Sequence, residues 1–157
     1  MEDEDGLSPQ YIIVGDGPAR AELEKYVIDN QLANVEFVGQ KVDIKPYLSQ
    51  MDIFILPSLS EGLGVAIIEA MAAGKCVIAS NIDGIKELVL NNKTGLLIEP
   101  RNSDEIYNKI KWCLDNKKEA LAIGQIAKQF IMDNTDKFDI SKGVLKYKYL
   151  FDRLMAD

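Results

Sequence analysis

The stretch DIFILPSLSEGLGVAIIEAMAAGKCVIA, residues 52–79, carries the pattern that decides the fold. It opens with Asp52 and an apolar run over 53–56 that contains two isoleucines, which predicts a buried strand over 52–56. A glycine-rich turn leads into a helical pattern that stops at Gly74, and a second apolar run follows over 76–79. A strand, a helix and a strand in this order predict a right-handed crossover between two parallel strands.

The same alternation extends to both sides of this stretch. Strands are predicted over residues 11–14, 35–38, 52–56, 76–79 and 96–98, with helices from about Pro18, over 43–50, from the glycine-rich turn to Gly74, and over 85–90. We therefore expect an α/β fold, a Rossmann-like parallel sheet of five strands with helices on both faces. Such a sheet binds its ligands at the carboxyl ends of its strands.

After Pro100 the pattern changes to helices without intervening strands. Three extra C-terminal helices are predicted from apolar residues at helical spacing, the last of them over about 140–154. At the other end, the first ten residues are acidic and contain Gly and Pro, so a flexible leader is expected over 1–10. The folded domain should then span residues 11–157.

Composition narrows the classes of protein that this chain can be. It has 157 residues, 47% of them hydrophobic, enough for one packed domain. Its apolar runs fall short of the roughly 20 residues that a membrane span needs, and its acidic start lacks the basic region of a signal peptide. The 18 basic and 25 acidic residues give a net charge of −7, which disfavours nucleic acid or anionic membrane as a partner. We expect a cytoplasmic protein.

The chain has no histidine, and this excludes Ser-His-Asp catalysis, Cys-His catalysis and most zinc chemistry. The two cysteines, Cys76 and Cys113, lie in apolar periodic stretches. They are too few for a disulfide framework, so we expect buried, reduced thiols.

Two glutamates eight residues apart are the strongest candidates for chemistry. Glu61 precedes the predicted helix and Glu69 lies inside it, with Gly62 and Gly64 between them to permit a tight turn. The N-terminus of a helix offers free N–H groups and a positive dipole end to an anion. This arrangement suits a phosphate with hydroxyl-rich groups on either side. The alternative is a structural role, in which Glu61 caps the helix and Glu69 is a solvated helix residue. For an arbitrary helix this structural role is the commoner one.

The glutamate pair resembles the E-x7-E signature of the group 1 retaining glycosyltransferases, which have the GT-B fold. The resemblance extends in family order from residue 11 to about 115, through blocks at residues 12–18, 35–39, 52–58, 74–80, 83–89 and 94–97. It implies that this chain is the C-terminal half of a GT-B fold, the half that binds the sugar donor.

The resemblance also implies a role for each site residue. Glu61 is the catalytic candidate, because it matches the glutamate beside the donor sugar, and Glu69 matches the one that holds the ribose hydroxyls of the nucleotide. The other implied donor-binding residues are Gly62, Leu63, Gly64 and Val65 at the sugar and diphosphate, Lys41 and Val42 at the base, and Gly15 and Gly17 in the first loop. No cofactor and no metal ion are implied.

The resemblance leaves part of the family's pattern unmatched. The family's C-terminal domain begins with a further strand and helix that carry an Arg and a Lys for the diphosphate, and its N-terminal domain binds the acceptor. We expect this chain to be a fragment whose partners are a nucleoside-diphosphate sugar and that missing domain, with any membrane contact made through the missing half. Cys76, often Pro in the family, and Asp83, often Gly, are expected to lie away from the chemistry.

Other interpretations fit the sequence less well. Gly15 and Gly17 suggest a dinucleotide-binding fingerprint, but its third glycine is missing and Pro18 interrupts it. Asp3 and Asp5 mimic a metal-binding pair, but they precede the first strand and suit an acidic tail. A non-catalytic nucleotide-sugar-binding subunit or sensor remains the alternative function. The donor base, the sugar and the acceptor cannot be read from the residues.

Overall fold

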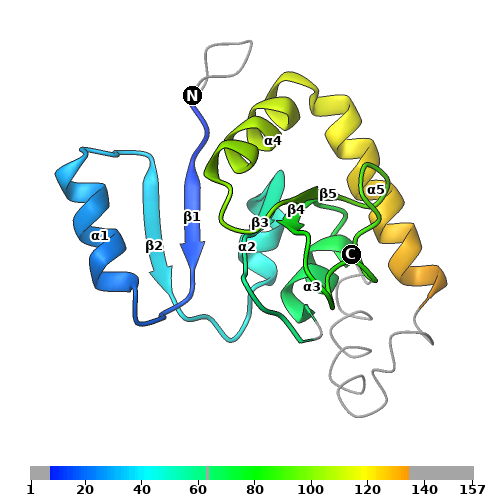
Figure 1. The fold of residues 1–157 in the computed structure, drawn as a ribbon, viewed down its shortest axis with the longest axis horizontal. Coiled ribbons are helices and arrows are strands. Elements are labelled where there is room, and N and C mark those ends of the chain that lie inside the picture. The colour runs from blue at the N-terminus through cyan, green and yellow to red at the C-terminus, as the bar shows by residue number, and fades with distance from the viewer. Residues whose placement is uncertain (1–7, 63, 135–157) are drawn as a thin grey trace. The chain divides into compact units, whose positions relative to one another are not determined.

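The computed structural model describes residues 8–62 and 64–134 (Figure 1). The chain divides into two compact units, Met1–Ile44 and Lys45–Asp157, and each is described here by itself. The predicted last helix, most of the predicted leader, and Leu63 lie outside the described residues. The expected extent of a single domain over 11–157 stays a prediction.

The first unit is a parallel strand pair joined by one helix. Strand β1 (Tyr11–Val14) pairs with β2 (Val35–Gly39), and α1 (Arg20–Asp29) connects them. The register shifts after Ile13, so that Val14 lies opposite Gly39. None of the residues of α1 is buried, and Tyr26 is 61% exposed. The unit therefore has little apolar core of its own.

The second unit is a three-stranded parallel sheet with helices. Its strand order is β3-β4-β5, which places β4 in the centre. In chain order the elements are α2 (Lys45–Gln50), β3 (Ile53–Leu56), α3 (Val65–Ala72), β4 (Cys76–Ser80), β5 (Leu96–Ile98), α4 (Ser103–Asp115) and α5 (Lys117–Asp133).

The core of the second unit is centred on β4. All five residues of this strand are buried, and since successive side chains point to opposite faces, both faces of β4 are covered. Helices α3 and α5 contact each other and β4, while α4 contacts β4 and β5 (Figure 1). Gly124 lets α5 approach closely, because a Cβ there would overlap the carbonyl oxygen of Gly74.

The predicted fold class is confirmed, but the predicted single sheet is not. All described strand pairs are parallel, and they form one pair and one triplet.

The predicted short helix over 85–90 is wrong, because residues 83–88 form consecutive turns. The carbonyl of Ile82 accepts from the N–H groups of Ile85 and Lys86, and the carbonyl of Ile85 accepts from those of Leu88 and Val89, so bonds over three and four residues alternate as in consecutive turns. Ile85, Leu88 and Val89 are nevertheless buried. The turns bury the same three apolar residues that gave the sequence its helical spacing.

Candidate functional site

The loop after β3 carries Glu61. Within this loop the hydroxyl of Ser58 donates a hydrogen bond of 2.8 Å to Oε1 of Glu61, and both residues are half-buried. Ser58 follows Pro57 directly after the strand ends, so its position is set by β3. The Glu61 carboxylate therefore lies at the carboxyl edge of the sheet, where parallel α/β sheets bind ligands.

A pocket of about 470 Å³ opens beside Glu61. Its lining comes from the loops that follow the adjacent parallel strands β3 and β4. The volume lies within the range of small-molecule sites. The lining is polar for the most part and consists of Leu59, Ser60, Glu61, Asn81, Ile82, Asp83 and Lys86.

Gly84 holds these two loops in contact. Its φ of +84° is a conformation that side-chain-bearing residues rarely adopt. A Cβ at this position would lie 2.7 Å from the carbonyl oxygen of Gly62 and 2.9 Å from that of Glu61. The backbone that carries Glu61 is thus supported directly by the loop after β4.

The N-terminus of α3 follows the same loop. Gly64 stands at the N-cap position with φ +59°, and no side-chain hydrogen bond caps the helix there. The N–H groups of Ile67 and Ile68 both donate to the carbonyl of Gly64. Those of Val65 and Ala66 have no acceptor within residues 8–62 and 64–134. The N-terminus of a helix is a favourable position for an anion, because of its N–H groups and the helix dipole.

The charged groups of the pocket wall are partly paired. Lys86 Nζ lies 3.4 Å from Oδ1 of Asp83, and Asn81 Nδ2 donates a 2.8 Å bond to Oε1 of Glu99. Asp83 is fully exposed and Lys86 is half exposed, so this pair contributes little to stability. In the described part of the chain, no three Cys, Asp or Glu side chains come together as a metal site would require.

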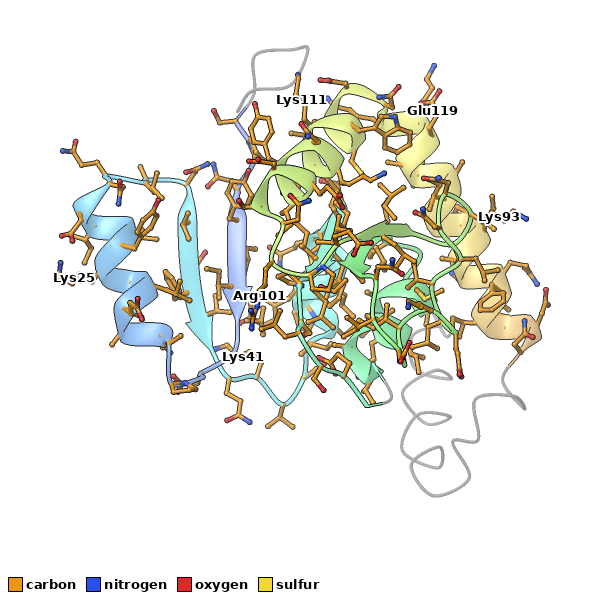
Figure 2. The ribbon with its side chains drawn as sticks, viewed as in Figure 1. Lys25, Lys41, Lys93, Arg101, Lys111 and Glu119 are labelled. Atoms are coloured by element: carbon orange, nitrogen blue, oxygen red, sulfur yellow. The ribbon has the colours of Figure 1, made fainter. Side chains whose placement is uncertain are left out.

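Four of the predicted donor-binding residues belong to the first unit. The N–H of Gly15 donates to the carbonyl of Gly39 at 2.9 Å, and the carbonyl of Gly17 accepts from the N–H of Arg20 at 3.0 Å. The side chain of Lys41 projects from the segment after β2 (Figure 2), and Val42 is fully exposed. How these residues lie with respect to Glu61 stays a prediction.

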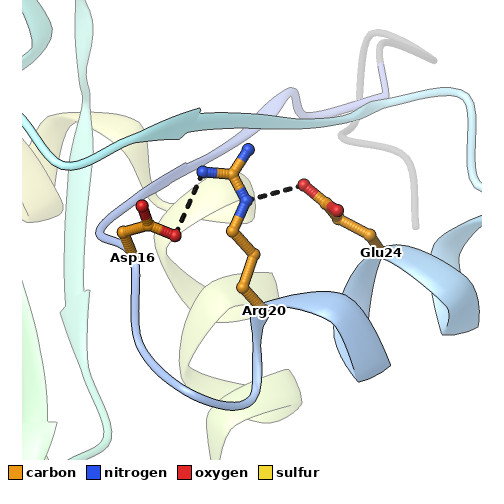
Figure 3. A network of polar contacts seen from close by, with 3 residues as sticks. All are labelled: Asp16, Arg20 and Glu24. Atoms are coloured by element: carbon orange, nitrogen blue, oxygen red, sulfur yellow. Dashed lines mark hydrogen bonds and ion pairs between the residues drawn. The ribbon is translucent and has the colours of Figure 1, made fainter.

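A small ionic network orders the loop after β1 (Figure 3). Arg20 Nε donates to Glu24 at 2.7 Å, and its Nη1 lies 3.3 Å from Oδ1 of Asp16. The hydrogen bond to Glu24, followed by its charge, raises the pKa of the Arg20 guanidinium. The network links the loop between Gly15 and Gly17 to the first turns of α1, at a solvent-exposed site where such pairs are weak.

In the second unit, the other predicted residues that the structure describes lie in α3 or in the loop before it. Glu69 is half-buried in the second turn of the helix and is not part of the pocket lining. Gly62 is exposed, and Gly64 and Val65 form the start of the helix. The structure thus brings Glu61 to the pocket and the N-terminus of α3 to the same loop, with Glu69 one turn further along.

Sequence reasoning missed Ser58, Asn81, Asp83 and Lys86. Asp83 was expected to lie away from the chemistry, yet it lines the pocket together with Glu61. For Ser58, Asn81 and Asp83, their position just after predicted strands could have indicated this, because the carboxyl ends of adjacent parallel strands share one edge. Lys86, which lies in the predicted helix over 85–90, carried no such signal.

A parallel sheet with a polar pocket and an uncapped helix N-terminus at its carboxyl edge defines a ligand-binding α/β protein of the doubly wound class. Within that class, the chain belongs to the family of group 1 glycosyl transferases, whose model matches residues 4–130. The resemblance found in the sequence is thereby confirmed.

Individual relatives agree with this family. The chain is 35% identical over 152 residues to an Escherichia coli UDP-Gal:alpha-D-GlcNAc-diphosphoundecaprenol alpha-1,3-galactosyltransferase, covering 94% of this chain and 38% of that enzyme. The crystal structure of Anabaena HepE in complex with UDP-glucose matches with a TM-score of 0.72 and 30% identity, over 77% of this chain and 35% of that one.

A third match concerns the part of the family fold that this chain represents. The C-terminal domain of the group 1 glycosyl transferase LpcC from Francisella tularensis matches with a TM-score of 0.72 and 26% identity, over 79% of this chain and 68% of that one. The chain spans 38% of the length of the E. coli enzyme and 40% of that of an uncharacterised glycosyltransferase from Methanocaldococcus jannaschii. Among the described residues, no helix is both long and apolar enough to traverse a bilayer.

Proposed function

We propose that this chain is the donor-binding part of a retaining glycosyltransferase that moves a sugar from a nucleoside-diphosphate sugar to a glycan or a lipid-linked acceptor. The observation that carries the proposal is the nearness of Glu61 to the uncapped N-terminus of α3. Glu61 and Val65 are four positions apart in the chain, a span of at most about 14 Å. One donor molecule can therefore place its sugar beside Glu61 and its diphosphate at the helix.

The chemistry follows from these two groups. When the bond between sugar and diphosphate breaks, negative charge develops on the diphosphate and positive charge on the anomeric carbon. The N–H groups of Val65 and Ala66 stabilise the first, and the carboxylate of Glu61 stabilises the second. Glu69, one turn further along α3, holds the ribose hydroxyls in this proposal and serves binding more than chemistry.

The relatives indicate which donor to test first. HepE has been solved with UDP-glucose and with UDP, and the E. coli relative is named for a UDP-galactose donor and a diphosphoundecaprenol acceptor. We therefore propose a UDP-sugar as donor. No metal takes part in the proposal, and the charge of the diphosphate is met by the helix N-terminus and by basic groups from outside this chain.

Calorimetric titration of this chain with UDP, GDP and ADP tests the proposal. We expect one preferred nucleotide and weak binding. Each missing charge-assisted hydrogen bond of the Arg and Lys that the family supplies is worth roughly 1.5–3 kcal/mol, so two of them weaken binding by two decades or more. Equal and unsaturable heats for all three nucleotides would favour a non-catalytic scaffold.

The full-length protein provides the test of transfer itself. It should transfer the sugar with retention at the anomeric carbon, which proton NMR of the product reads directly, and activity should persist in EDTA. Saturable binding of the donor without transfer to any acceptor would support the alternative, a nucleotide-sugar sensor or subunit. The cytoplasmic location and any membrane contact through the missing half stay predictions.

A further inference from the structure

We propose that Ser58 is a positioning residue that fixes the orientation of the Glu61 carboxylate, an inference that rests on the catalytic role proposed for Glu61. The Ser58 hydroxyl donates to Oε1 of Glu61 at 2.8 Å. The two residues are three positions apart in the chain, both in the loop after β3. This bond joins two side chains, so it orients the carboxylate and does not cap or close the loop backbone.

The hydrogen bond leaves the carboxylate able to act. An ionised carboxylate has about four acceptor positions on its two oxygens, and Ser58 occupies one of them. The rest remain for a sugar hydroxyl or for the charge that develops at the anomeric carbon. Without Ser58, the Glu61 side chain can rotate about its bonds. Ordering it in the transition state then adds to the activation free energy. Groups held in place before the reaction accelerate it most.

The backbone around Glu61 is held by a different contact. Gly84 supports the carbonyl oxygens of Glu61 and Gly62 from the loop after β4. The hydroxyl of Ser58 donates to the side chain of Glu61, and removing this hydroxyl should free that side chain without moving the loop. A change in turnover at an unchanged donor affinity is therefore the signature expected of Ser58.

The test uses the full-length protein with a UDP-sugar donor and compares Ser58→Ala, Ser58→Thr and Ser58→Cys. Ser58→Ala should lower kcat by roughly 10-fold, the loss expected for one hydrogen bond to a charged group, and leave the donor Kd within about two-fold. Ser58→Thr keeps the hydroxyl and should retain most of kcat. Ser58→Cys, with its weak donor, should fall between them.

Ser49→Ala is the matched control. Ser49 is an exposed residue of α2 whose hydroxyl donates to the carbonyl of Pro46 at 2.9 Å, outside the pocket. This variant should keep the wild-type kcat. Melting temperatures of all variants show whether they fold. If Ser58→Ala does not fold, Ser58→Cys tests the role of the hydroxyl, because its thiol is only a weak donor.

A double variant separates this proposal from the proposed function. If Ser58 acts through Glu61, Ser58→Ala should cost nothing further in a Glu61→Ala background. An additive loss, or a wild-type kcat in Ser58→Ala alone, overturns the positioning role while leaving Glu61 in place. A Glu61→Ala protein with undiminished turnover overturns the proposed function itself.

Discussion

Gly84 packs against the backbone of Gly62, so closely that a Cβ on Gly84 would lie 2.7 Å from the carbonyl oxygen of Gly62. The two residues belong to the loops after β4 and β3, the same loops that line the pocket beside Glu61. Because backbone meets backbone here, neither side can yield by a side-chain rotation. The contact fixes the geometry of the pocket.

Gly84→Ala should therefore reduce both stability and turnover. The positive φ and the clash with two carbonyl oxygens together predict a loss of about 1–3 kcal/mol in the free energy of unfolding. Urea unfolding of this chain measures it. Gly17→Ala is the control for stability, because a Cβ there meets nothing within 4 Å. If the two variants unfold at the same urea concentration, the contact at Gly84 is not tight.

Glu61→Gln and Glu69→Gln should affect different kinetic constants of the full-length protein. Glu69→Gln should weaken donor binding by roughly 10- to 100-fold, since it removes a charged hydrogen-bond acceptor remote from the reacting bond. Glu61→Gln should lower kcat more than donor affinity, because its charge acts in the transition state. Steady-state kinetics separate the two. An inverted product, or full turnover in Glu61→Gln, would contradict the assignment.

Ser80→Ala should stabilise the chain by about 1 kcal/mol. The Ser80 hydroxyl is buried, and among residues 8–62 and 64–134 it has no hydrogen-bond partner. No hydrogen bond therefore offsets the free-energy cost of removing this hydroxyl from water. Thr94→Val is the matched contrast. The buried hydroxyl of Thr94 accepts from the N–H of Leu90 at 2.8 Å, and its loss should cost about 1–3 kcal/mol.

Chemical denaturation of the two variants checks this contrast. A destabilised Ser80→Ala chain would mean that the Ser80 hydroxyl has a partner outside the described residues. Thr94→Ser, which keeps the hydroxyl, shows how much of the Thr94 effect comes from its methyl group.

Cys113 should resist alkylation even at alkaline pH. Its Sγ lies 3.8 Å from that of Cys76, and both residues are buried. The hydrogen bond to Cys76, followed by burial, raises the pKa of the Cys113 thiol. Raising the pH from 7 to 9 should therefore produce little thiolate in the folded chain, whereas a free thiol ionises near pH 8.5.

Mass spectrometry of the Cys113 peptide after iodoacetamide treatment gives the rate of this reaction. The urea-unfolded chain is the control and should react about as fast as a free thiol at pH 9. An equally fast reaction in the folded chain would show that the site opens readily or that its pKa is not raised.

The elements of this protein follow from its sequence, because apolar periodicity and turn residues act locally. Residues 11–14 and 96–98 form strands with the predicted bounds, and each of the other three strands differs from its predicted range by one residue at one end. The two glutamates can also be recognised from the local sequence. They are eight positions apart with two glycines between them, a spacing that places one before the start of a helix and the other inside it.

The tertiary structure determined which elements and which side chains are neighbours. The apolar spacing over 85–90 predicted a helix, but consecutive turns bury the same residues, and pairing divided the strands into two sheets. Asp83 and Lys86 reach the pocket of Glu61 only because β3 and β4 are neighbours in the sheet. Cys76 and Cys113 meet across β4 and α4, 37 residues apart in the chain. Such contacts depend on how whole elements pack, which local propensity does not encode.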